Sequence, residues 1–168
     1  MDKIQDLMYK MIQYDRGDPK RIQHFIKVHS FAKLIGESEG LTADCLFILE
    51  AAALVHDIGI KTAEAKYGLC DGKLQEQEGP APARAILHLL EIEENTIERI
   101  VYLVAHHHTY ENVEGMDYRI LLEADFLVNL YEDNLSEKAV SAALKKIFRT
   151  RSGTEICKTM FAHNVNHS

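Results

Sequence analysis

The sequence contains the stretch Leu49-Glu50-Ala51-Ala52-Ala53-Leu54-Val55-His56-Asp57-Ile58-Gly59, an alanine- and leucine-rich run that ends in an adjacent histidine and aspartate. The run predicts a buried helix that stops before the glycine. A buried and unpaired His-Asp pair would be costly. An imidazole nitrogen and a carboxylate oxygen together suit divalent zinc, manganese, iron or cobalt. Taken alone, such a pair at a helix end is more often a cap or a hydrogen-bonded polar pair than a set of metal ligands.

Two further polar residues are expected on apolar helix faces elsewhere in the chain. Asp18 and Pro19 predict a helix start, as N-cap and first helical residue. His24 lies in that helix on the face formed by Val28, Phe31, Ala32 and Ile35. Asp125 shares a face with Leu121, Leu122, Val128 and Asn129, and a buried aspartate is almost never unpaired. One shared cation would satisfy all four polar side chains, from three helices, at once.

A family resemblance rests on three ordered motifs. They are Arg21-Ile22-Gln23-His24, Leu54-Val55-His56-Asp57-Ile58-Gly59 and Glu123-Ala124-Asp125. This order of motifs resembles that of the HD-domain metal-dependent phosphohydrolase superfamily. The resemblance implies an all-α fold, a single compact domain of about seven to eight helices around a buried metal site. It implies that His24, His56, Asp57 and Asp125 hold a divalent metal, and that water or hydroxide attacks a phosphate ester. The same fold also carries other chemistry.

The sequence His106-His107-His108 resembles the His-His motif of the binuclear branches of this superfamily. A helix through Ile97 and Val104 turns by about 100° per residue, so positions 107 and 108 continue its inward face and position 106 points away. We therefore expect His107 and His108 to be ligands of a second metal. The alternative is that the histidines interact with the exposed carbonyls and the dipole of a helix end.

Two other residues have both a functional and a solvent-exposed interpretation. Binuclear members usually supply a further histidine just ahead of a glycine, where this chain has Glu78 before Gly79. Glu78 is either an oxygen ligand and general base or a solvated loop charge. Lys61 is either a cation that neutralises a phosphate oxygen or a surface lysine. The candidate catalytic residues are thus Asp57, Glu78 and Lys61, and the expected cofactor is one or two divalent ions among Mn, Fe, Zn, Mg, Co and Ni.

Composition sets the remaining bounds. The 168 residues suggest one domain, with the motifs in residues 20–132 and C-terminal helices in 136–164 packed on them. A formal net charge of −7 argues against a duplex nucleic-acid binder. Three cysteines without scaffold spacing suggest reduced thiols in a cytoplasmic protein. The absence of a long uncharged apolar stretch predicts no membrane partner.

Helices are expected from a short N-terminal segment onward, and one long loop interrupts them. The expected helices comprise one through Ile4 to Ile12 and others at about 18–36, 43–57, 82–90, 96–109 and 118–132, with two more after Ser136 and from Thr154. Residues 58–79 have two internal glycines and little apolar periodicity, so we expect a long loop. That loop would cover the metal cleft and reach substrate through Lys61 or Tyr67.

Three function classes follow from these patterns. The leading hypothesis is a phosphatase or phosphodiesterase that acts on a nucleotide or another small phosphorylated metabolite through a metal-activated water. The second is a di-iron oxygenase on the same fold. The third is a non-catalytic metal- or nucleotide-binding module. A homodimer remains possible through the apolar faces of the last two helices.

Overall fold

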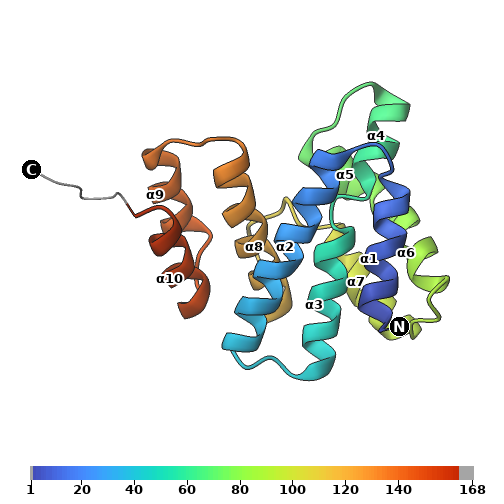
Figure 1. The fold of residues 1–168 in the computed structure, drawn as a ribbon, viewed down its shortest axis with the longest axis horizontal. Coiled ribbons are helices and arrows are strands. Elements are labelled where there is room, and N and C mark those ends of the chain that lie inside the picture. The colour runs from blue at the N-terminus through green and yellow to red at the C-terminus, as the bar shows by residue number, and fades with distance from the viewer. Residues whose placement is uncertain (1, 163–168) are drawn as a thin grey trace, which may run out of the picture.

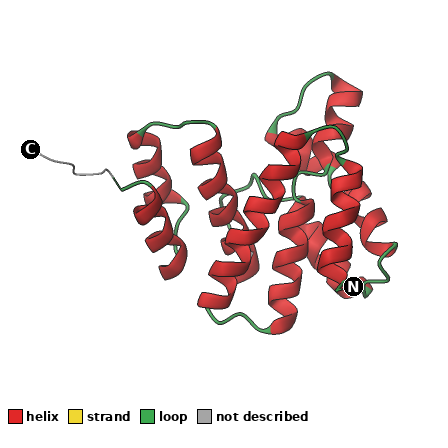
Figure 2. Cartoon of the chain, viewed as in Figure 1, coloured by secondary structure: helices red, strands yellow, loops and turns green. Residues whose placement is uncertain are grey.

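The computed structural model describes residues 2–162, which form ten α-helices and no β-strand. Figure 2 shows the helices joined by loops and turns. None of them is long and apolar enough to cross a lipid bilayer. In chain order they are α1 (Lys3–Tyr14), α2 (Pro19–Ser38), α3 (Ala43–Val55), α4 (Gly59–Tyr67), α5 (Gly72–Glu78), α6 (Pro80–His88), α7 (Glu94–Val104), α8 (Met116–Glu132), α9 (Glu137–Lys146) and α10 (Arg151–Met160).

Helix α2 lies at the centre of the fold and packs mainly against α3 and α8. Helices α9 and α10 lie beyond α8 at one end of the molecule, and α4 and α5 lie at the upper right (Figure 1). One hydrophobic cluster runs through the described residues, from Ile4 on α1 through Leu54 on α3 to Cys157 on α10. The all-α fold expected from the sequence is therefore confirmed.

Side-chain caps fix where several helices begin. The Asp18 carboxylate accepts a hydrogen bond from the Arg21 N–H at 3.0 Å, and Ser136 accepts one from Ala139 in the same way. These two starts are as predicted. The last helix begins at Arg151 and not at Thr154, because Thr150 is its cap and accepts from the Gly153 N–H at 2.9 Å.

The prediction of a long loop at residues 58–79 is wrong, because this segment forms the two short helices α4 and α5. Its apolar pattern is weak because the buried side of α4 is built from Gly59 and Ala63 and not from large side chains. At Gly59 a Cβ atom would lie 2.6 Å from both the Gln75 oxygen and the Gly79 nitrogen. The missing side chain thus lets the backbone of α4 pack directly against the end of α5.

Candidate metal centre

Helices α2, α3 and α8 bring four polar side chains to one buried point. His24 comes from the second turn of α2, His56 and Asp57 directly follow α3, and Asp125 comes from α8. His56 is fully buried, His24 and Asp125 are buried, and Asp57 is partly buried. The Nε2 atoms of His24 and His56 are 3.2 Å apart. The structure thus brings together all four residues of the set implied by the family resemblance.

The spacing of these atoms suits ligands around a shared ion. Asp57 Oδ2 lies 3.3 Å from His24 Nε2 and 3.5 Å from His56 Nε2, and Asp125 Oδ1 lies 3.2 and 3.5 Å from the same nitrogens. Direct charged hydrogen bonds are shorter, at about 2.7–2.9 Å. Ligands about 2.1 Å from one ion are about 3.0 Å apart at a right angle and about 3.4 Å apart at a tetrahedral angle. The donor set and its spacing therefore fit a divalent metal.

The second nitrogen of each imidazole already has a partner outside the cluster. His56 Nδ1 donates to the Ala53 carbonyl at 2.9 Å, and His107 Nδ1 donates to the Val104 carbonyl at 2.7 Å. Both carbonyls belong to the last turn of a helix, where no intrahelical N–H reaches them. These bonds select the tautomer whose Nε2 lone pair points into the cluster. The C-terminal ends of α3 and α7 also direct their negative dipole ends toward it.

A second group of ligand atoms lies on the other side of Asp57. Asp57 Oδ1 is 3.3 Å from His107 Nε2, and His108 supplies another nitrogen close by. His106 points away, stacks on Tyr102 and hydrogen-bonds to the Tyr102 carbonyl. The structure thus brings His107 and His108 to Asp57, as expected, although α7 ends at Val104 and a turn carries the triplet. Asp57 presents one oxygen to each group.

The structure places Gln75, and not Glu78, beside the second group. The Gln75 side-chain oxygen lies 2.8 Å from His108 Nε2 and 3.4 Å from His107 Nε2. The Glu78 carboxylate instead pairs with Lys66 at 2.6 Å and accepts from the Tyr67 hydroxyl at 3.0 Å. Residues three apart on a helix are one turn apart, so α5 carries Glu78 a turn beyond the cluster. The sequence interpretation missed Gln75 because it treated this segment as a loop.

The electrostatics of the cluster match a cation site. Burial opposes protonation of His56, but Asp57 and Asp125 outweigh it and raise the pKa of His56 from 6.5 to about 9. Burial acts to raise the pKa of Asp57 and Asp125, yet the surrounding histidines hold both well below the ordinary value of 3.8. Burial and the charge of His107 lower the pKa of His108 to about 4, so its ring is neutral at pH 7. Both carboxylates are therefore ionised, and they favour a positive charge at this point, either on His56 or on a bound cation.

The cluster lies in a pocket of about 640 Å³. Its wall includes Lys20 and Arg21 from the start of α2. Tyr110 and Phe126 also line it, with their rings edge-to-face and the ring centroids 5.3 Å apart. Lys61 does not line this pocket. Its ammonium donates to the Tyr14 carbonyl at 2.6 Å and lies over the Tyr14 ring, because α4 turns this side chain toward α1.

Comparison with known proteins identifies the fold. The sequence profile described as HD domain matches residues 21–149. The chain belongs to the HD domain family. A crystal structure of a predicted HD superfamily hydrolase from an uncultured Thermotogales bacterium is similar, with a TM-score of 0.63 and 22% identity over 95% of this chain and 83% of that one. No curated protein sequence matches the chain.

The HD-domain assignment agrees with the donor set, since HD domains bind divalent metals. Two residues that support the donors were not singled out from the sequence in this role. Asn129 donates to Asp125 Oδ1 at 2.9 Å, and Glu132 lies 3.0 Å from His24 Nδ1. Asn129 and Glu132 follow Asp125 by four and seven residues, so helical periodicity places them on the same face of α8 as Asp125. That periodicity was the sequence signal that could have identified them.

Proposed function

We propose that this HD-domain protein is a metal-dependent phosphohydrolase that acts on a nucleotide or another small phosphorylated metabolite. The observation that carries the proposal is the position of Asp57, which lines the pocket and whose two oxygens face two separate groups of histidines. Asp57 would thus be a ligand of each of two divalent ions, and two such ions supply the charge stabilisation used by many phosphate-ester hydrolases. The comparison structure described as a hydrolase supports the same reaction class.

Each protein group has a distinct task in this proposal. Divalent ions, when bound, supply a nucleophilic water near neutral pH and polarise the phosphoryl oxygens. His24, His56, Asp57 and Asp125 would hold one ion, and Asp57, His107 and His108 would hold the other. Asp57 and Asp125 contribute two negative charges, which leaves a net positive site for an anionic substrate. The His108 ring is neutral at pH 7, so one of its two nitrogens carries a lone pair.

The pocket favours a small substrate over a polymer. Its volume of about 640 Å³ is in the range of small-molecule sites. Asp18, Glu64 and Asp133 line it as well, and such acids repel an extended polyanion. The Arg21 guanidinium lies 3.5 Å from both Asp18 and Glu64 and lines the pocket, where it would meet a phosphate group. The aromatic pair of Tyr110 and Phe126 offers an apolar wall for the rest of the substrate.

The test combines metal analysis with assays of the purified protein. Metal per chain is counted in the wild type, in Asp57→Ala and in Asp44→Ala, an exposed change on α3, the helix that precedes Asp57. Phosphatase and phosphodiesterase activity on chromogenic esters and on nucleotides is then measured with Mn²⁺. We expect about two ions and activity in the wild type and in Asp44→Ala, and loss of both in Asp57→Ala. Absence of metal, or of hydrolysis with any supplied metal, would contradict the proposal; two irons with oxygen consumption would indicate an oxygenase instead.

A further inference from the structure

His24 differs from His56 and His107 in how its outer nitrogen is satisfied. His56 and His107 follow helix ends, where last-turn carbonyls accept their Nδ1 protons. His24 is the sixth residue of the twenty-residue helix α2. The carbonyls three and four residues before it are engaged in the i to i−4 bonds of that helix. The backbone therefore offers His24 no free acceptor, and its ring needs one from another element.

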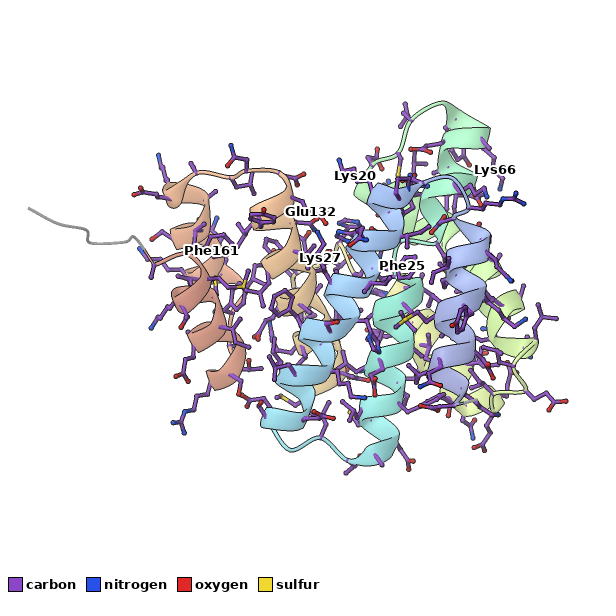
Figure 3. The ribbon with its side chains drawn as sticks, viewed as in Figure 1. Lys20, Phe25, Lys27, Lys66, Glu132 and Phe161 are labelled. Atoms are coloured by element: carbon purple, nitrogen blue, oxygen red, sulfur yellow. The ribbon has the colours of Figure 1, made fainter. Side chains whose placement is uncertain are left out.

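Glu132 supplies that acceptor from the last residue of α8. Its Oε2 atom lies 3.0 Å from His24 Nδ1, and its Oε1 atom lies 2.6 Å from the Lys27 ammonium. Figure 3 labels Glu132 and Lys27 close together where α8 and α2 adjoin, and the two side chains form an ion pair. The Glu132 side chain is only 13% exposed, whereas that of Lys27 is 39% exposed. Both carboxylate oxygens of Glu132 thus contact a residue of α2, one His24 and the other Lys27.

Helix geometry explains how these groups meet. His24 and Lys27 are three residues apart and share one face of α2. Asp125 and Glu132 are seven residues apart and share one face of α8, so Asp125 meets the inner nitrogen of His24 and Glu132 meets the outer one. A carboxylate at the C-terminal end of a helix is unfavourable with respect to the helix dipole. The position of Glu132 is therefore better explained by its effect on His24 than by the stability of α8.

We infer that Glu132 is a positioning residue that holds His24 in the tautomer and orientation in which its Nε2 atom can bind the metal, with Lys27 fixing the carboxylate. The inference rests on the proposed metal binding. Carboxylates that accept from a metal-binding histidine orient the ring and increase its basicity, and their loss typically weakens metal binding by about 10- to 100-fold. Glu132 acts through the imidazole and does not touch the reacting atoms.

The fold contains a matched control on the same helix α2. His29 Nε2 lies 2.9 Å from Glu50 Oε1, and the Lys33 ammonium lies 3.2 Å from the same oxygen. This trio has the same chemistry as His24, Glu132 and Lys27, and the Glu50 side chain is 8% exposed, against 13% for Glu132. None of its members belongs to the donor groups of the metal centre. Glu50→Ala therefore removes an equivalent buried contact without altering a predicted ligand.

The experiment titrates Mn²⁺ into metal-stripped protein by calorimetry and records the melting temperature of each metal-free variant. We expect Glu132→Ala to weaken Mn²⁺ binding by about 10- to 100-fold. Glu132→Gln keeps an acceptor oxygen and loses only the charge, so it should recover most of the affinity. Glu50→Ala should lower the melting temperature and leave the affinity unchanged.

Three results would overturn the inference while leaving metal binding intact. The first is wild-type affinity in Glu132→Ala. The second is an equal loss of affinity in Glu50→Ala, which would indicate a general structural effect. The third is a Glu132→Gln variant as weak as Glu132→Ala, which would assign the effect to charge alone. A wild type that binds no Mn²⁺ and no other divalent ion would overturn both this inference and the proposed function.

Discussion

Replacement of Glu123 by alanine should destabilise the C-terminal helices without affecting the metal centre. Glu123 is fully buried on α8. Its Oε1 atom accepts from the Arg149 and Thr150 N–H groups at 2.7 and 2.9 Å, and its Oε2 atom accepts from the Thr150 hydroxyl at 2.5 Å. Thr150 is in turn the N-cap of α10. One carboxylate therefore fixes the start of α10 against α8.

The magnitude follows from these three bonds. Hydrogen bonds to a charged group contribute roughly 1.5–3 kcal/mol each, so three independent bonds would give roughly 4.5–9 kcal/mol. The actual loss should be smaller, because the three bonds are lost together and the variant avoids the cost of burying a carboxylate. We expect the free energy of unfolding to fall by about 3–5 kcal/mol, as for other broken buried networks. For a protein of this size, that loss lowers the melting temperature by roughly 6–20 °C.

Denaturant unfolding followed by circular dichroism measures the loss, with Mn²⁺ affinity recorded in parallel. Glu155→Ala is the control, because Glu155 is exposed on α10, and its effect should stay within about 0.5 kcal/mol. Metal affinity should be retained, since residues 123 and 125 differ by about 200° around the helix axis. A stability change below about 1 kcal/mol, or a parallel loss of metal affinity, would refute this reasoning.

Three further predictions concern the metal centre and its surroundings. His107→Ala removes a ligand from the second group only, so elemental analysis should find one ion fewer per chain; unchanged metal content would remove His107 from the ligand set. In chelator-treated protein, the pKa of His56 is raised from 6.5 in the unfolded chain to about 9 in the folded one. The stability that this gives is fully present below pH 6.5 and is lost as the pH rises through about 9. Denaturation midpoints should therefore fall between these two pH values in the wild type and not in His56→Ala. Gly59→Ala places a methyl group 2.6 Å from the Gln75 oxygen and should cost roughly 1–3 kcal/mol of unfolding free energy, and a denaturation midpoint equal to that of the wild type would disprove the close approach of α4 and α5.

The helices that could be predicted from sequence are those with strong local signals. Asp18 before Pro19 and Ser136 before Ala139 marked helix starts that the structure confirms. The segment that became α4 and α5 gave a weak signal, because glycine and alanine at its buried positions carry little hydrophobic contrast. Its helices depend on direct backbone packing at Gly59, which no local pattern reveals.

The candidate metal residues divide in a similar way. His24, Asp57 and Asp125 could be selected from sequence because each is a polar group on or beside an otherwise apolar helical segment. The positions of Glu78 and Gln75 could not, since a shift of one turn along α5 decides which side chain reaches His107 and His108. The direction of Lys61 likewise depends on how α4 sits against α1.

From the sequence by itself, apolar periodicity predicted helices and singled out the four polar side chains that meet at the centre, because both are local properties. The HD domain was implied by the resemblance of the ordered motifs. Only the tertiary structure decided which atoms of those side chains face each other. It set the two oxygens of Asp57 toward different histidines, and it placed Glu132 behind His24. Such contacts join residues as many as 108 positions apart, and they depend on the packing angle and register of whole helices, which no short stretch of sequence encodes.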